Sequence, residues 1–283
     1  MNSLFHTNQP SSPPSPLRVL PTPEARPKVL EYLSASRLKC WQTCRRQFYF
    51  RYVERIKTPT APALFIGQQV HEILKLHNWS RWKDEPFDPE WLKSELDDSW
   101  EDGLAADHIS WKAAGDEAKA KEQAWAMLEA YFEESPVPPS ENPEGVEVEV
   151  ECHLDSFDIR LIGIIDLVRP RGLIVDYKTA ARAPSSSAGP QQHATQLSCY
   201  ALLFRESTGM QESGFELHYL IKTKQPKILV TSLGPMSEQL QSELFQLIDD
   251  YLEGISAEAW IPSPGQHCSW CDHQTACLRM SGL

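Results

Sequence analysis

The sequence predicts a mixed α/β fold, and two observations carry that prediction. Apolar residues follow a helical spacing through most of the first half of the chain, whereas residues 146–154 alternate strictly between apolar and polar side chains. Short apolar runs typical of strands and two further helical segments make up most of the rest. A chain of 283 residues, of which 41% are hydrophobic, is also long enough to bury a large core.

The elements are expected in a definite order along the chain. Ser34 is a suitable N-cap, so the first helix begins there and covers residues 34–55. The other helices are expected at residues 65–79, 90–106, 114–134, 191–206 and 237–254. The strands are expected at residues 146–154, 157–169, 173–178, 214–222 and 227–233. Pro- and Gly-rich segments predict a linker at residues 136–145 and a flexible loop at residues 181–190.

Residues 1–30 are rich in proline and show little hydrophobic periodicity, which predicts a disordered tail. Residues 31–283 are expected to form a single domain, composed of a helical part (31–135), an α/β core (146–235) and a C-terminal helix with a cysteine cluster (236–283). No apolar run approaches the ~20 residues that a membrane-spanning helix needs. The chain also starts without the pattern of a secretion signal, so we expect a cytoplasmic protein without membrane contact.

Charge is distributed unevenly along the sequence. The formal net charge of −12 argues against a broad positive surface. Residues 37–57 nevertheless carry seven Lys and Arg residues, among them Arg45 and Arg46, against one acidic residue, with aromatic residues between them. Cations that hold phosphates and rings that stack on bases favour binding of a nucleic-acid strand. An amphipathic helix with a solvated basic face is the alternative.

Two carboxylates interrupt apolar strands in the segment "IGIIDLVRPRGLIVDYKTA", residues 162–180. Asp166 and Asp176 lie equally far from a turn centred near Arg171, so they should face each other on adjacent strands. Lys178 lies two residues after Asp176 and should point to the same side of the sheet. Burying such charges costs several kcal/mol unless a partner or a metal ion compensates them.

A divalent cation is one solution to the repulsion between these carboxylates. Carboxylate oxygens select hard ions such as Mg²⁺ or Mn²⁺, which can hold phosphate oxygens and lower the pKa of a bound water. An adjacent lysine can orient that water. The alternative is a cross-strand salt bridge between Lys178 and one of the two aspartates, without catalytic function.

The C-terminal segment "CSWCDHQTAC" contains Cys268, Cys271 and Cys277 in a C-x2-C-x5-C pattern. Three thiolates make an incomplete metal site, so a fourth ligand is expected from elsewhere in the chain. A structural Zn²⁺ ion accepts four cysteines, whereas disulfides are disfavoured without an export signal. Cys152 and Cys199 lie within strand and helix patterns and are expected to be buried small hydrophobic residues.

These segments together resemble a known family. "GIIDLV" followed by "IVDYKTA" is similar to the core of the PD-(D/E)xK nuclease superfamily, with Asp166, Asp176 and Lys178 as its two acids and its lysine. "GQQVHEIL" with His71, "QLSCYALL" with Gln196 and Tyr200, and "LSASRLKCWQTCRRQFYFRYV" resemble elements of its RecB-like branch. That branch includes the AddB nuclease domain and CRISPR-adaptation nucleases. The order and spacing of the segments between residues 34 and 277 carry the resemblance.

The resemblance implies a restriction-endonuclease-like core, in which helices flank a mixed β-sheet and the C-terminal Cys-rich loop closes on the first helix. It implies that Mg²⁺ or Mn²⁺ is held by His71, Asp166, Asp176 and the backbone carbonyl of Tyr177. Lys178 would position the attacking water, while Gln196 and Tyr200 would support the site or contact the strand.

The resemblance further implies a [4Fe–4S] cluster on Cys268, Cys271, Cys277 and a cysteine of the first helix. Cys44 matches the family position best because it directly precedes "RRQF", and Cys40, one helical turn away, is a possible substitute. Zn²⁺ is the alternative occupant. In either case the site would be structural and would join the first helix to the C-terminal loop.

The implied function is that of a metal-dependent nuclease that acts on single-stranded DNA ends in repair or recombination, beside a helicase or another partner protein. A CRISPR-adaptation nuclease has the same chemistry with other partners. A non-catalytic, iron–sulfur-containing DNA-binding scaffold and an unrelated zinc-binding protein are alternatives of other classes. The chain has no Walker-type phosphate-binding motif, so it is not itself the helicase motor.

Overall fold

The computed structural model describes residues 30–185 and 188–283. Most of the proline-rich segment that was expected to form a tail lies outside these residues. The described chain forms a mixed sheet with the strands β1 (Tyr32–Leu33), β2 (Gly145–Leu154), β3 (Ile159–Arg169), β4 (Leu173–Ala180), β5 (Gly214–Ile221) and β6 (Lys227–Leu233). Neighbouring strands follow the order β1-β3-β4-β5-β6, and β2 pairs with β3. The pairs β1–β3 and β4–β5 are parallel, whereas β2–β3, β3–β4 and β5–β6 are antiparallel.

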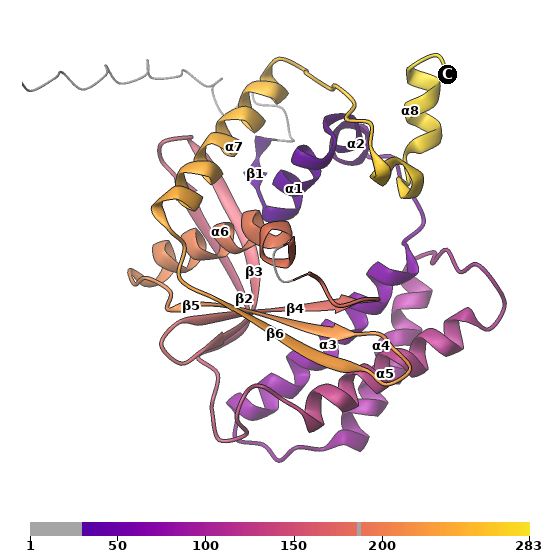
Figure 1. Ribbon diagram of the computed structural model, residues 1–283, viewed down its shortest axis with the longest axis vertical. Coiled ribbons are helices and arrows are strands. Elements are labelled where there is room, and N and C mark those ends of the chain that lie inside the picture. The colour runs from indigo at the N-terminus through magenta and orange to yellow at the C-terminus, as the bar shows by residue number, and fades with distance from the viewer. Residues whose placement is uncertain (1–29, 186–187) are drawn as a thin grey trace, which may run out of the picture.

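Helices cover both faces of this sheet (Figure 1). The described helices are α1 (Ala35–Thr43), α2 (Arg45–Phe48), the π-helix η3 (Tyr49–Val53), α3 (Pro62–Trp82), α4 (Pro89–Ala106), α5 (Asp116–Glu133), α6 (Ala188–Thr208), α7 (Glu238–Ser256), the 3₁₀-helix η4 (Gln266–Trp270) and α8 (Gln274–Met280). One hydrophobic core joins α1, α6 and α7 to one face of the sheet, and a second core joins α3, α4 and α5 to the other. The predicted α/β fold, with helices on both sides of a mixed sheet, is therefore confirmed.

Local sequence signals explain where several helices begin. Ser34 caps α1, as predicted, by accepting a hydrogen bond from the amide of Arg37. Asp88 and Ser237 cap α4 and α7 in the same way. No helix in the described part of the chain is both long and apolar enough to cross a membrane.

The first predicted helix is interrupted at Cys44, which corrects the expectation of one continuous helix over residues 34–55. Cys44 has an extended backbone (φ −166°, ψ 115°), and the helical path resumes at Arg45 and continues into the π-helix η3. Cys40 and Cys44 are therefore not on one regular helix face. The extended backbone re-aims the Cys44 side chain, whose sulfur accepts a hydrogen bond from the amide of Ser263 at 3.4 Å.

The strand β3 has different pairing partners along its two edges. β2 pairs with β3 from Ile159 to Val168 on one edge. On the opposite edge, β1 pairs only with Arg160 and Leu161, and β4 pairs only with residues 167–169. Among residues 30–185 and 188–283, no strand pairs with the segment of β3 between these two contacts on that edge, and a cavity opens there.

The close approach of α7 to α1 fixes the first helix on the sheet. A Cβ atom at Gly254 would lie 2.2 Å from the Trp41 ring, and the Trp41 indole donates to Asp250 of the same helix at 2.8 Å.

We expect Gly254→Ala to lower the free energy of unfolding by about 1–3 kcal/mol, because the ring must move to admit the methyl group. Denaturant unfolding followed by circular dichroism measures this change. Gly234→Ala is the matched control, because a Cβ there meets nothing within 4 Å. Equal stability of the two variants would show that the α1–α7 contact is not tightly packed.

Candidate active site

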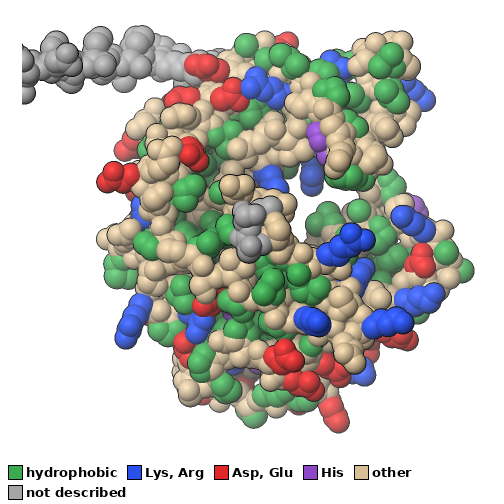
Figure 2. Space-filling view, viewed as in Figure 1, with side chains coloured by type: hydrophobic (Ala, Val, Ile, Leu, Met, Phe, Trp, Pro, Cys, Tyr) green, Lys and Arg blue, Asp and Glu red, His purple; other side chains and the backbone are tan. Residues whose placement is uncertain are grey.

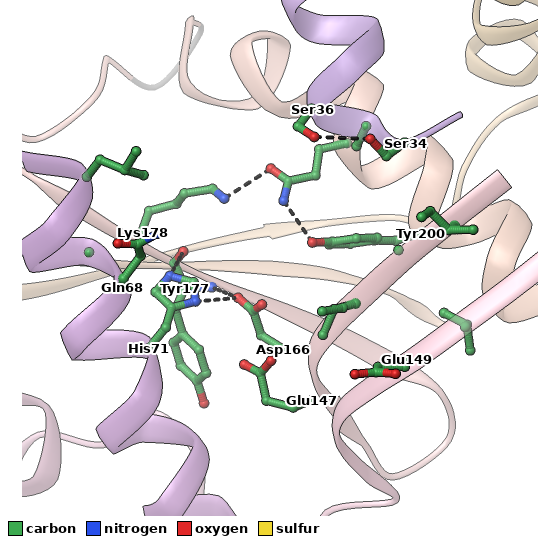
Figure 3. Close-up of a pocket in the computed structure, with 18 of the residues that line it drawn as sticks. Ser34, Ser36, Gln68, His71, Glu147, Glu149, Asp166, Tyr177, Lys178 and Tyr200 are labelled. Carbon is green, nitrogen blue, oxygen red and sulfur yellow. Dashed lines mark hydrogen bonds and ion pairs between the residues drawn. The ribbon is translucent and has the colours of Figure 1, made fainter. Parts of the chain in front are cut away.

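A cavity of about 1090 Å³ opens where β3 lies between β1 and β4. Its walls come from α3, β2, β3, β4, α6 and the start of α1, and they include most of the predicted site residues: His71, Asp166, Tyr177, Lys178, Gln196 and Tyr200. Figure 3 shows that His71, Asp166, Lys178 and Tyr200 reach this cavity from separate elements. The residues that the resemblance singled out thus lie around one cavity, and their roles remain a prediction.

The two acids of the hairpin occupy facing positions, as predicted. Leu167 pairs with Val175 and Arg169 pairs with Leu173, so the same register places Asp166 opposite Asp176. The Asp166 carboxylate accepts a hydrogen bond from the backbone amide of Tyr177 at 2.9 Å, which fixes its orientation.

His71 projects from α3 toward Asp166. Its Nε2 contacts the carbonyl oxygen of Tyr177 at 2.9 Å, and since a carbonyl can only accept, Nε2 carries a proton. The other nitrogen, Nδ1, lies 3.5 Å from Oδ2 of Asp166. Burial lowers the pKa of His71, but the carboxylates of Asp166 and Asp176 outweigh that effect and raise the pKa overall. A proton or a metal ion is therefore favoured at Nδ1.

Asp176 is buried and bound to two side chains in the cavity. Its Oδ2 lies 2.6 Å from Nζ of Lys178, and its Oδ1 accepts a hydrogen bond from Nε2 of Gln196 at 2.9 Å. Burial raises the pKa of Asp176 to about 6, although Lys178 opposes that rise. The ion pair agrees with the prediction that Asp176 and Lys178 share a face.

Gln196 on α6 contacts two candidate site residues of β4, Asp176 and Lys178. Its Oε1 accepts from Nζ of Lys178 at 3.0 Å, and its Nε2 is 2.8 Å from the hydroxyl oxygen of Tyr200, one helical turn further on. A single amide thus fixes the positions of Lys178, Asp176 and Tyr200 together.

Glu147 was not among the residues singled out from the sequence, yet it lies in the same group. The pairs Val146–Leu167 and Val148–Ile165 place Glu147 opposite Asp166 on β2. One ligand atom from each of His71, Glu147 and Asp166 lies within 4.8 Å of the others. Burial and the neighbouring Asp166 raise the pKa of Glu147 to about 7. The strict alternation of β2 gave a signal, because it put Glu147 on the polar face, but it put Glu149 and Glu151 there as well.

Buried hydrogen bonds support Tyr177 from the opposite face of the sheet. Its hydroxyl oxygen accepts from Nδ2 of Asn78 at 2.9 Å, and its ring lies 5.6 Å from that of Tyr131. The Tyr131 hydroxyl in turn contacts Nδ1 of His218 at 3.0 Å. Because the backbone of Tyr177 contacts both His71 and Asp166, this network holds the site in place.

Arg45 and Arg46, predicted to contact nucleic acid, make contacts within the protein instead of lining the cavity. Arg45 forms an ion pair with Asp250 at 2.7 Å and lies over the Trp41 ring. Arg46 donates to the carbonyl oxygen of Trp260 at 3.3 Å and to the hydroxyl of Ser281 at 2.7 Å. These contacts hold α2 against α7 and the C-terminal segment, and DNA contact by the two arginines remains a prediction.

Of the C-terminal cysteines, Cys271 lies near Cys44 and Cys40 of the first helical region. Burial raises the pKa of the Cys271 thiol, and its neighbours Cys44 and Cys268 contribute to that rise. Cys40 is also nearby, and burial raises its thiol pKa to about 12. In the described part of the chain, no three cysteine sulfurs lie within 4.8 Å of one another.

The fold and the cavity agree with the comparison to known families. The family model of the PD-(D/E)XK nuclease superfamily matches residues 32–278, so the chain belongs to that superfamily. Nucleases of this superfamily generally use divalent metal ions, and the His71–Glu147–Asp166 group offers ligands for one. Family and site together identify a nuclease.

A solved structure shows the same fold. A crystal structure from Eubacterium rectale, provisionally described as an exonuclease, is similar with a TM-score of 0.57 at 16% identity, and the similarity covers 90% of this chain and 94% of that one. A crystal structure of SSO0001 has a TM-score of 0.41 at 12% identity over 89% of this chain and 88% of that one, too low to support an argument. No curated protein sequence matches the chain significantly.

Proposed function

We propose that the chain is a metal-dependent DNA nuclease of the RecB-like branch that degrades single-stranded DNA from its ends. The observation that carries this proposal is a single cavity that brings a potential metal site and a lysine together. His71, Asp166 and Lys178 line it, and Lys178 forms an ion pair with the buried Asp176. This arrangement suits phosphodiester hydrolysis.

The donor set fits Mg²⁺ or Mn²⁺. Carboxylate and carbonyl oxygens suit both ions. The resemblance assigns Asp166, Asp176, His71 and the Tyr177 carbonyl to this ion, which when bound would activate water and neutralise charge on the phosphate. Lys178, held between Asp176 and Gln196, would orient the attacking water by donating a hydrogen bond, while Gln196 and Tyr200 keep its ammonium group in position.

Single-stranded ends are the preferred substrate in this proposal. The net charge of −12 disfavours a broad duplex-binding face. Figure 2 shows a hollow on one face of the molecule, between the part formed by α1, α2 and α8 and the part formed by α3 and α4, with Lys and Arg side chains around it. Such local positive charge favours the phosphates of a single strand. The repair or recombination role, the helicase partner, the cytoplasmic location and the organisation of residues 31–283 as one nuclease domain belong to the same proposal.

The four cysteines Cys44, Cys268, Cys271 and Cys277 form, in this proposal, the site of a [4Fe–4S] cluster. The C-terminal segment returns to the first helical region through the contacts Ser263–Cys44 and Arg46–Ser281. The cluster would hold α1, α2 and the C-terminal segment together.

The direct test is cleavage of end-labelled single-stranded DNA by anaerobically purified protein with Mn²⁺, Mg²⁺ or EDTA. We expect metal-dependent shortening of linear strands and no cleavage of circular single strands, which have no ends. Cleavage of the circles would contradict the exonuclease assignment. Failure of well-folded, metal-loaded protein to cut any DNA would favour the scaffold alternative.

A further inference from the structure

Two large apolar side chains are exposed inside the cavity, and the chemistry proposed above uses neither of them. Ile164 on β3 is 46% exposed, although Leu161 and Ile165 on the same strand are buried. Leu64, in the first turn of α3, is 52% exposed. Both side chains line the cavity. A single exposed leucine is ordinary, but two such side chains on separate walls of one cavity form an apolar surface that a ligand can cover.

The position of Leu64 relative to the candidate metal ligands follows from the packing of α3 on β4. Leu64 is seven residues before His71, so the two share a helix face about 10 Å apart along the axis. His71 contacts the carbonyl oxygen of Tyr177, and a Cβ atom at Gly67, one turn earlier, would lie 3.3 Å from the hydroxyl oxygen of Thr179. The path from His71 to Leu64 therefore follows β4 toward its C-terminal end.

The strand β3 supplies the second wall at the same end of the cavity. It runs antiparallel to β4, so the direction that leads to the end of β4 leads to earlier residues of β3. Ile164 lies in that direction, two residues before Asp166. Leu64 and Ile164 thus lie to the same side of His71 and Asp166, on walls formed by different elements.

Charge differs between the two sides of this cavity. Lys178 lines it from β4, and burial together with the nearby charge of Lys178 lowers the pKa of Lys39 on α1. On β2, which flanks the other edge of β3, Glu149 pairs with Ile164 and also lines the cavity. Figure 3 shows Lys178 and Glu149 on opposite sides of Asp166. Phosphates are attracted by the lysines and repelled by the glutamate, so the bases of a strand, rather than its phosphates, should face β2 and β3.

We propose that Leu64 and Ile164 form a binding site for one nucleobase of the strand that is cut, next to the phosphate held at His71 and Asp166. This inference deepens the proposed function and rests on it for the identity of the substrate. An aliphatic surface covers the face of any base, so the site does not select a sequence. A base reaches the site only when it is unpaired, so the same contact favours single strands over duplexes.

The test is binding of fluorescein-labelled oligothymidylate to the full chain, measured by fluorescence anisotropy in EDTA to prevent cleavage. We expect Ile164→Thr and Leu64→Gln each to weaken binding about three- to tenfold, because each removes apolar surface from the base. Leu229→Thr is the matched control: Leu229 is 38% exposed on strand β6, away from the residues that line the cavity, and its loss should change binding less than about twofold.

A matched ligand separates contact with the base from a general change in the protein. An abasic strand of tetrahydrofuran residues has the same length and the same phosphates as oligothymidylate. The wild type should bind oligothymidylate more tightly, and Ile164→Thr and Leu64→Gln should each reduce that preference about three- to tenfold while they bind the abasic strand as the wild type does. Both side chains are about half exposed, so both variants should fold, which circular dichroism checks. A folded variant of either kind that weakens both ligands equally, or that binds as Leu229→Thr does, would overturn the inference.

Cleavage of end-labelled DNA by the wild-type protein, measured in parallel, distinguishes this inference from the proposed function. A preference for bases that both variants lose, in a protein that cuts no DNA, would refute the nuclease proposal alone. DNA cleavage by a protein whose two variants keep the wild-type preference for bases would refute this inference alone.

Discussion

Lys178→Ala is expected to reduce DNA cleavage by a factor on the order of a hundred to a thousand, while the protein remains folded. In the structure Lys178 is the cation held by both Asp176 and Gln196, so its loss leaves the attacking water without its donor. Initial rates on end-labelled single-stranded DNA with saturating Mn²⁺ measure the effect. Lys121→Ala, which removes a surface ion pair with Asp97, is the matched control and should cut normally.

The stability of Lys178→Ala is also expected to depend on pH in a defined way. Without Lys178, the buried Asp176 should have a pKa above its present value of about 6. A carboxyl whose pKa is higher in the folded state than in the unfolded state binds more protons when folded, so stability is lost as pH rises through the folded pKa. Lys178→Ala should therefore melt closer to the wild type in mildly acidic buffer than in mildly alkaline buffer. If Lys178→Ala were unfolded at every pH, the result would instead favour the alternative in which Lys178 and Asp176 form a salt bridge without catalytic function.

Cys44→Ala is expected to bleach the iron–sulfur absorption and to lower the free energy of unfolding by several kcal/mol, because the cluster would join segments more than 200 residues apart. Cys271→Ala should have the same effect. Visible absorption, iron content and thermal melting of anaerobically purified protein measure it.

Cys40→Ala is the matched control for the fourth ligand. Burial raises the pKa of the Cys40 thiol to about 12, which disfavours the thiolate that a metal needs. Cys44, by contrast, lies at the extended break between α1 and α2. If Cys40→Ala bleached the protein and Cys44→Ala did not, the assignment of the fourth ligand would be wrong. If neither Cys44→Ala nor Cys271→Ala changed the colour or melting temperature, the cluster itself would be refuted.

The hairpin of β3 and β4 shows what can be predicted from local sequence pattern. The positions of Asp166 and Asp176 followed from counting outward from a turn, and the register confirms them. This worked because strand pairing next to a short turn is fixed by the turn itself, and because side chains alternate with a period of two. Helix positions followed from periodicity and capping for the same reason, with small shifts at their ends.

The basic segment shows contacts that local sequence pattern does not reveal. Arg45 and Arg46 were predicted to bind a nucleic-acid strand. In the structure they have partners in α7 and in the C-terminal segment of the protein itself. Those partners lie more than 200 residues away in sequence, so no local signal distinguishes a bracing arginine from a DNA-binding one. The break at Cys44 has the same origin, because contacts with the C-terminal segment outweigh helix propensity there.

Four features could be predicted from the residues alone: the α/β order, the facing acids, the lysine beside them and the spacing of the C-terminal cysteines. Each of these depends on short-range periodicity or on motif order, which the residues carry directly. Two further relations became visible in the folded chain: Glu147 lies with His71 and Asp166, and Asp176 is bound to Lys178 and Gln196. Those relations depend on how β2, α3 and α6 pack around β3, and that packing is fixed by long-range burial rather than by neighbours in sequence.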